Sequence, residues 1–404
     1  MSKVLIIGFV WPEPTSSAAG VRMMQLIHSF LNQGFEVHFA TQSQDKTYAF
    51  DLNSLGITTH PIEVNNSNFD SFIIELSPDI VLFDRFIMEE QFGWRVAENC
   101  PNTLRILDTE DLHFLRKERK QQLNKSNAEE SSFSEIAKRE VASIYRSDLT
   151  LIISEVEIEL LLNKYQVPSE RLLYLPMWSE IYDSSKSFEE RFHFMFIGNF
   201  MHEPNWDAVR FLKNDIWPKI RQKLPITELH IYGAYPSDKV FQLTNEKEGF
   251  IIKGRADTVN EICQQYRVML APLRFGAGVK GKFIDAMRNG LPSITTPLGS
   301  ESMLEISSWP GFVSNNSEEI ISKSIEIYLN NEYWNDLSRS ALSIHNEKFT
   351  AQNWPLLFIE KVNEYKINLR QIRNRNFTGE MLMHHTVQST KFMSKWIELK
   401  NKLI

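Results

Sequence analysis

Apolar and polar positions follow one another along the chain in a pattern that predicts strands and helices in turn. Residues 3–8 form a continuous apolar run, which is typical of a central strand in a parallel sheet. A helix is expected at residues 18–32, where Gly34 ends it. This βαβ succession predicts a doubly wound sheet with right-handed crossovers. Further strands are expected at residues 36–41, 57–61, 79–83, 104–107, 149–154 and 172–175, and helices at 89–98, from 111 onward and at 155–165.

A second alternation of the same kind begins at residue 192, after a polar stretch without periodicity. Its strands are expected at 192–198, 228–232, 250–253, 268–272, from about 292 and at 311–313, and its helices at 205–223 and 259–266. Two Rossmann-like α/β domains should therefore face each other across a cleft, where ligands of open sheets bind. The expected organisation is a first domain at 1–178, a linker at 179–191, a second domain at 192–348 and C-terminal helices at 349–404 that cross back to the first domain.

Composition narrows the function classes. The chain has 404 residues, 42% of them hydrophobic, which suits two globular cores and excludes fibrous and disordered classes. A net charge of −7 argues against a nucleic-acid partner. Cys100 and Cys263 show no disulfide or metal-binding spacing, and the first apolar run is too short to span a membrane or form a signal peptide. The expected compartment is the cytoplasm, and no oligomeric state is indicated.

The segment 271–296 combines a buried strand, a glycine-rich loop, a helix and a second strand. Loop glycines let backbone N–H groups approach an anion, and the helix N-terminus adds a partial positive charge. Cations beside such donors suit a diphosphate, and a carboxylate one turn later suits sugar hydroxyls. The alternative is a structural turn with surface lysines. The residues concerned are Arg274, Gly276, Gly278, Lys280 and Lys282 in the loop and Asp285 on the helix.

This segment, with Pro297–Glu301 after it, resembles the donor site of the GT-B "glycosyl transferases group 1" proteins of family 4. Residues 196–208, 231–233 and 253–255 and, more loosely, 8–22 extend the resemblance. It implies a glycosyltransferase that moves a sugar from a nucleotide diphosphate sugar to a glycan, lipid-linked or protein acceptor, with retention and without a metal or other cofactor. The implied donor-site residues are Arg274, Lys280 and Lys282 on the diphosphate, Asp285 on the ribose, Gly198, and Arg255 at the base, although Arg255 could equally be a surface residue.

Two departures from the family pattern stand out. The loop 199–205 has no Arg or Lys, although relatives often carry both there, so the later loop would bear the diphosphate charge alone. Ala277 stands where many relatives have the first Glu of a Glu-x7-Glu pair, and Asp285 stands at the second. The sequence therefore resembles a subgroup that lacks the first Glu.

Carboxylates follow two apolar strands in the first domain, where side chains should face the cleft. Asp84 is expected to contact the acceptor, and Glu110 stands where relatives have a His near the sugar. Asp108, Glu110 or Asp111 could orient the sugar or take the acceptor proton, or they could simply cap the next helix. Two further residues are candidates with equally plain alternatives. Arg116 could grip an acidic acceptor or belong to a solvated basic face, and Gly20 could approach the donor or be only a loop glycine.

The segment 365–404 is basic, with eight Lys or Arg and two Glu in an acidic chain. Phe392, Trp396, Leu399 and Leu403 recur at helical spacing. The favoured interpretation is a helix that packs on the first domain with a solvated basic face. The other is contact with a membrane surface or an anionic acceptor.

Three hypotheses of function follow from the sequence. The first is the glycosyltransferase. The second is a nucleotide-sugar epimerase on the same fold, which would need acid–base groups but no acceptor site. The third is a catalytically silent nucleotide-sugar-binding module, which the two departures from the family pattern would explain.

Overall fold

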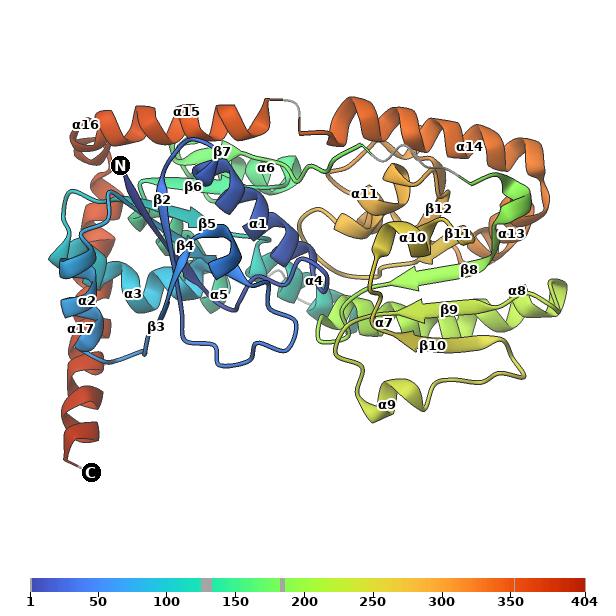
Figure 1. Ribbon diagram of the computed structural model, residues 1–404, viewed down its shortest axis with the longest axis horizontal. Coiled ribbons are helices and arrows are strands. Elements are labelled where there is room, and N and C mark those ends of the chain that lie inside the picture. Colours follow the sequence, from blue (N-terminus) through green and yellow to red (C-terminus); the bar gives the residue numbers. More distant parts are fainter. Residues whose placement is uncertain (1, 125–132, 182–185, 352, 404) are drawn as a thin grey trace.

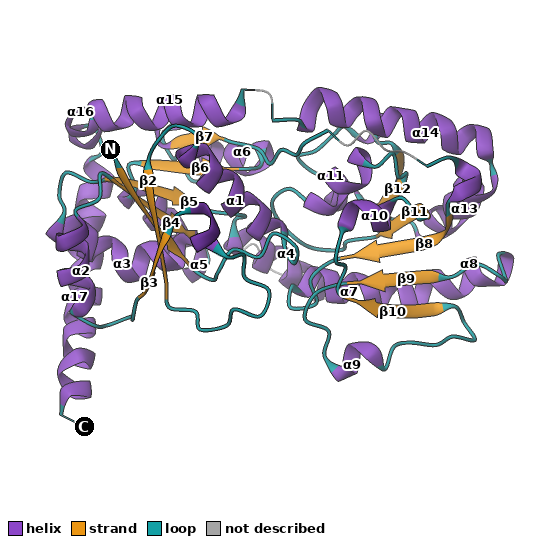
Figure 2. Ribbon diagram, in the orientation of Figure 1, coloured by secondary structure: helices purple, strands orange, loops and turns teal. Residues whose placement is uncertain are grey.

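The computed structural model describes residues 2–124, 133–181, 186–351 and 353–403. Most of the polar stretch 124–134 and part of the expected linker 179–191 lie outside these residues. In the described part, two parallel sheets stand side by side, and each is covered by helices (Figures 1 and 2).

The first sheet has seven described strands in the order β3-β2-β1-β4-β5-β6-β7. This is the Rossmann order with one added strand, as the alternating pattern predicted. The strands are β1 (Lys3–Gly8), β2 (Glu36–Thr41), β3 (Thr58–Pro61), β4 (Ile80–Asp84), β5 (Leu104–Asp108), β6 (Leu149–Ile152) and β7 (Leu172–Tyr174). The helices are α1 (Ala18–Leu31), α2 (Asn68–Leu76), α3 (Arg85–Asn99), α4 (His113–Asn124), α5 (Glu135–Arg146) and α6 (Glu155–Asn163).

Strand β1 shows why this sheet needs helices on both faces. Its side chains alternate between two apolar clusters, because successive residues of a strand point to opposite faces. Val4 and Ile6 belong to the cluster that includes Phe30 of α1, whereas Leu5 and Ile7 belong to the cluster on the opposite face. All four are fully buried, which explains why the strand is a continuous apolar run.

The second sheet has six described strands in the order β10-β9-β8-β11-β12-β13, again the Rossmann order. The expected helix at 205–223 is broken by a π turn at Leu212–Ile216, because Pro218 has no N–H to continue the regular ladder. The strands are β8 (Phe192–Ile197), β9 (Leu229–Tyr232), β10 (Phe250–Gly254), β11 (Tyr266–Ala271), β12 (Ser293–Thr295) and β13 (Gly311–Val313). The helices are α7 (Glu203–Phe211), α8 (Trp217–Lys223), α9 (Asp238–Phe241), α10 (Val259–Cys263), α11 (Gly281–Arg288), α12 (Pro297–Ser300), α13 (Ser317–Leu329) and α14 (Asn331–Ile344).

The C-terminal helices return to the first domain, as expected from the sequence. They are α15 (Trp354–Ile367), α16 (Leu369–Asn374) and α17 (Phe377–Lys402), and Figure 1 shows them along the outer side of that domain. Phe358 of α15 is buried in the first domain's core, with its ring centroid 5.2 Å from that of Phe30. The first domain is therefore completed by residues that follow the second in sequence.

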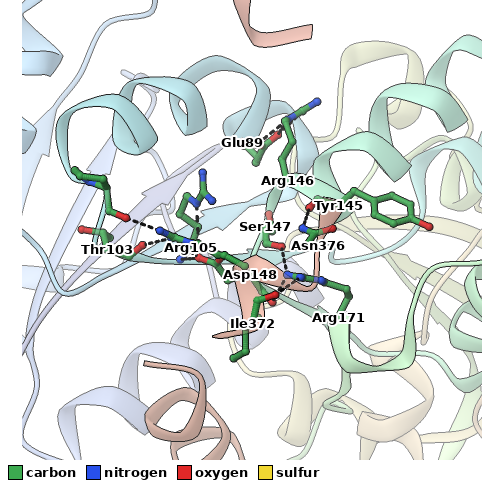
Figure 3. A network of polar contacts seen from close by, with 12 residues as sticks. Glu89, Thr103, Arg105, Tyr145, Arg146, Ser147, Asp148, Arg171, Ile372 and Asn376 are labelled. Carbon is green, nitrogen blue, oxygen red and sulfur yellow. Dashed lines mark hydrogen bonds and ion pairs between the residues drawn. The ribbon is translucent and has the colours of Figure 1, made fainter. Parts of the chain in front are cut away.

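A buried polar network fixes α16 to the first domain (Figure 3). Asp148 accepts hydrogen bonds from the Arg105 backbone N–H at 2.9 Å and from the Arg373 guanidinium at 2.7 and 2.8 Å. Burial alone would raise the pKa of Asp148, but the charges of Arg105 and Arg373 outweigh it and lower the pKa. Arg171 also donates to the Ile372 carbonyl at 2.9 Å. The ionised carboxylate thus holds together groups from distant parts of the chain.

We expect Asp148→Asn to lower the free energy of unfolding by about 3–5 kcal/mol, because it leaves the buried Arg105 and the partly buried Arg373 without a counter-charge. Urea titration followed by circular dichroism measures this change. Glu98→Gln is the matched control, since it breaks a more exposed pair with Lys391 and should cost about 1 kcal/mol or less. Equal losses in the two variants would contradict the role given to Asp148.

Candidate functional site

A cavity of about 640 Å³ lies between the two domains at the carboxyl ends of both sheets. From the first domain it is lined by residues that follow β1, β4 and β5, and from the second by residues that follow β8, β9 and β11. Parallel α/β sheets bind ligands at this edge because loops and helix N-termini converge there.

The end of the glycine-rich loop and the first turn of α11 place two lysines, Lys280 and Lys282, at the cavity. Lys280 donates to the Gly278 carbonyl at 2.8 Å, and burial lowers its pKa to about 8. Lys282 donates to Asn205 Oδ1 at 2.6 Å, lies 4.3 Å from the Phe196 ring centroid, and has its pKa lowered to about 7 by burial. Both ammonium groups have thus lost much of their hydration, which an anion in the cavity would replace.

Arg274, predicted to join these lysines, is placed elsewhere. Its guanidinium pairs with the Asp207 carboxylate at 2.5 and 2.8 Å and stacks on Phe211. It is partly exposed and does not line the cavity. The bidentate pair thus directs this guanidinium to a carboxylate on α7 rather than to the cavity.

The loop glycines serve contacts between the domains. The Gly276 carbonyl accepts from Arg119 of α4 at 3.0 Å. The Gly278 N–H donates to Glu157 of α6 at 2.9 Å. A Cβ at Gly278, whose φ is +63°, would lie 2.9 Å from the Asp111 Cβ, so only glycine fits there. The backbone N–H of Gly278, expected to face an anion, instead bonds to a carboxylate of the first domain.

The other predicted donor-site residues lie around the cavity. Asp285 lines it from α11, and burial raises its pKa to about 6. Arg255 lines it too, donates to Thr15 Oγ1 at 2.6 Å and stacks on the Tyr48 ring of the opposite domain. Gly198 and Gly20 permit close packing, since a Cβ would lie 2.5 Å from the Asn205 side chain and 2.3 Å from the Glu13 backbone, respectively.

The carboxylates after β4 and β5 divide into two groups. Asp108 is fully buried, pairs with Arg22 at 2.8–3.0 Å and does not line the cavity. Asp84 lines the cavity, accepts from the Phe9 N–H at 3.0 Å, and has its pKa raised by burial. Asp108 therefore pairs with Arg22 away from the cavity, whereas Asp84 lies in the cavity wall.

Glu110 and Asp111 both reach the cavity but differ in charge. Burial, together with the negative charges of Asp108 and Asp84, raises the pKa of Glu110 to about 8, so this carboxyl is protonated at neutral pH. Burial alone would raise the pKa of Asp111, but its ion pair with Arg116 outweighs this and lowers the pKa. Glu110 also has a φ of +63°, an uncommon conformation for a residue with a side chain and one often found at functional sites.

Sequence reasoning did not identify Glu157. Its Oε1 accepts from the Leu112 N–H at 3.0 Å and from the Gly278 N–H at 2.9 Å, and its buried Oε2 has no hydrogen-bond partner among the described residues. Burial raises its pKa to about 7. The only sequence signal is Ser154 three residues earlier, which suggests a capping box, but the Glu157 carboxylate bonds across the cleft instead.

Two other features of the site are contacts that the sequence does not reveal. Arg119 forms a bidentate ion pair with Glu301 across the domains at 2.7 Å. His113 and His202, one from each domain, line the cavity near Asp111, and burial lowers the pKa of each to about 4. Among the described residues, no group of three or more His, Cys, Asp and Glu side chains is arranged to hold a metal ion.

Comparisons with known proteins place these features in a wider context. The family model of "Glycosyl transferases group 1" matches residues 191–331, the region that contains β8–β13, so the chain carries a glycosyltransferase domain. A comparison with curated protein sequences gave no significant match.

Solved structures are similar over most of the chain. Sucrose-phosphate synthase from Thermosynechococcus elongatus has a TM-score of 0.69 at 12% identity, covering 90% of this chain and 99% of that one. HepE of Anabaena, solved with UDP and glucose, has 0.68 at 10% identity, covering 90% and 100%. A glycosyltransferase from Rickettsia africae has 0.64 at 11%, covering 91% and 98%. At these identities the likeness shows the fold, which is GT-B as predicted.

We expect Glu157→Gln to flatten the pH dependence of stability. The raised pKa means that the native state favours the protonated acid, so wild-type stability falls as pH rises from the ordinary value of 4.5 through about 7. Gln keeps the Oε1 acceptor but never ionises, so the wild type should lose roughly 3 kcal/mol relative to the variant between about pH 5 and 8. Urea titrations across this pH range measure the difference. The exposed Glu155→Gln on the same helix should follow the wild-type profile, and parallel profiles for all three proteins would contradict the expectation.

Proposed function

We propose that this protein transfers a hexose from a nucleotide diphosphate sugar to a hydroxyl of a glycan, lipid-linked or protein acceptor. The observation that carries the proposal is the pair of poorly hydrated ammonium groups, Lys280 and Lys282, at a cavity whose opposite wall bears the protonated Glu110. The match of residues 191–331 to group 1 glycosyl transferases supports it.

In the proposed reaction, the acceptor oxygen bonds to the anomeric carbon as the bond from that carbon to the diphosphate breaks. The departing nucleoside diphosphate gains negative charge, which Lys280 and Lys282 stabilise without a metal. Preorganised charges of this kind are often the largest catalytic contribution. The acceptor proton passes to the leaving phosphate oxygen, which accords with retention at the anomeric carbon.

The donor-binding roles follow from position. Asp285 lines the cavity from α11, whose first turn carries Lys282, so we assign it to hydroxyls of the ribose. Arg255, stacked on Tyr48, is assigned to the base. Ala277 lines the cavity where the family pattern has a Glu, and the donor sugar is therefore held from the first domain instead. Glu110, Asp84 and the Asp111–Arg116 pair are the groups we assign to sugar and acceptor.

We expect Lys280→Met and Lys282→Met each to weaken nucleoside diphosphate binding about tenfold to a hundredfold, the usual worth of a charge-assisted hydrogen bond. Titration calorimetry with UDP, GDP and ADP measures the affinities. Because binding should restore the charged form of Lys282, wild-type binding near pH 8 should take up protons, and Lys282→Met should take up fewer. The exposed Lys239→Met in the same domain is the control. Comparable losses from Arg274→Met would instead support the sequence-based role of Arg274.

We expect Glu110→Ala to lower release of nucleoside diphosphate from the sugar donor about tenfold or more, with nucleotide affinity unchanged, because a hydrogen bond to the sugar is lost. Glu110→Gln still donates a hydrogen bond and should recover part of the rate. If Gln is as inactive as Ala, Glu110 acts as a base.

Conversion of the donor without an acceptor would favour the epimerase, and binding without turnover would favour the binding module.

A further inference from the structure

Helix α17 has one face against the first domain and the opposite face open to solvent. It contacts α3 and α5. Ser394 is buried and accepts a hydrogen bond from Arg95 at 3.1 Å, and Gly379 is so close to α5 that a Cβ would lie 2.3 Å from the Tyr145 carbonyl. Figure 1 shows the helix on the side of the first domain that is remote from the second. The orientation of α17 is therefore fixed by its inner face.

The outer face carries large apolar side chains. Phe392 is 63% exposed, Trp396 58%, Leu399 62% and Leu403 88%. Their spacing of four, three and four residues places them in one stripe on the helix, since a turn takes about 3.6 residues. Exposed apolar residues are ordinary when scattered, but a stripe of four with two aromatic rings marks an interaction surface.

Lysines border this stripe on both sides. At about 100° per residue, Lys395 and Lys400 lie about 70° to either side of the stripe's centre. Neither forms an ion pair in the described part of the chain, and Lys400 lies 5.5 Å from the Trp396 ring centroid. Lys391 and Lys402 are paired with Glu98 and Glu398. The surface is thus apolar along its centre and positive along its edges.

We propose that this face of α17 docks on the surface of an anionic lipid bilayer, with the helix lying in the plane of the interface. Aromatic rings and leucines enter the boundary between headgroups and acyl chains, while lysine stems extend toward anionic headgroups. No helix among the described residues is long and apolar enough to cross a membrane. If two copies of the chain met through this surface, the lysines along its edges would lie close together and repel one another. The inference does not depend on the proposed function.

Vesicle flotation with the full chain tests the proposal. We expect binding to vesicles of equal parts phosphatidylglycerol and phosphatidylcholine, weaker binding at high salt, and little binding to phosphatidylcholine alone. Phe392→Ser with Trp396→Ser should weaken binding about tenfold or more, as should Lys395→Glu with Lys400→Glu. Because these side chains are exposed, the melting temperature should stay near the wild-type value.

Two matched controls separate this face from general surface properties. Ile226→Ser with Leu329→Ser removes equally exposed apolar side chains from the second domain, and Lys223→Glu with Lys247→Glu makes the same change in net charge there. Both should bind as the wild type does. The proposal is overturned if the wild type does not bind anionic vesicles, if the α17 variants bind equally well, or if the wild type is a dimer that Phe392→Ser with Trp396→Ser dissociates.

Discussion

The Glu157 carboxylate accepts hydrogen bonds from both sides of the cleft, and the shape of the cavity depends on it. One N–H comes from Leu112, just before α4, and the other from Gly278 in the loop that leads to Lys280 and α11. Because both bonds end on the same oxygen, the loop and the start of α4 are fixed relative to one another. Arg119 of the same helix forms a second contact between the domains, a bidentate ion pair with Glu301. A ligand therefore meets a site assembled from both domains rather than two separate half-sites.

The sequence predicted features that depend on near neighbours and missed those that depend on distant ones. The β11–loop–α11 unit was foreseen because an apolar run, glycines and a helix start are all local signals. Arg274 was expected to join Lys280 and Lys282, but its partner Asp207 is 67 positions away, and no periodicity reveals such a pair. Glu157 went unnoticed for the same reason. In α17, the spacing of apolar residues was visible in sequence, whereas which face meets the domain is decided by packing.

The cavity and the contacts around it bring together groups that are costly to bury in their charged forms. Lys280 and Lys282 have lowered pKa values and Glu110 and Glu157 raised ones, in every case chiefly because of burial. Arg85 and Glu110, which follow β4 and β5, both have positive φ angles. Strain and desolvation at one place are sustained only by a well-packed surrounding structure, and the two Rossmann cores supply it. A bound anion and sugar would relieve part of this cost, which is one physical basis for tight, selective binding.

The return of α15 and α16 to the first domain has a consequence for how the protein is made. Phe358, Val362 and Leu369 belong to the first domain's core, yet they follow the whole second domain in the chain. During synthesis the ribosome releases all of the second domain before it releases these residues. Domains generally fold as units in the order in which they emerge. Here the first domain cannot complete its core until these later residues have been synthesised. The second domain can therefore bury its own core first, and the first domain completes its core last, when the C-terminal helices pack onto it.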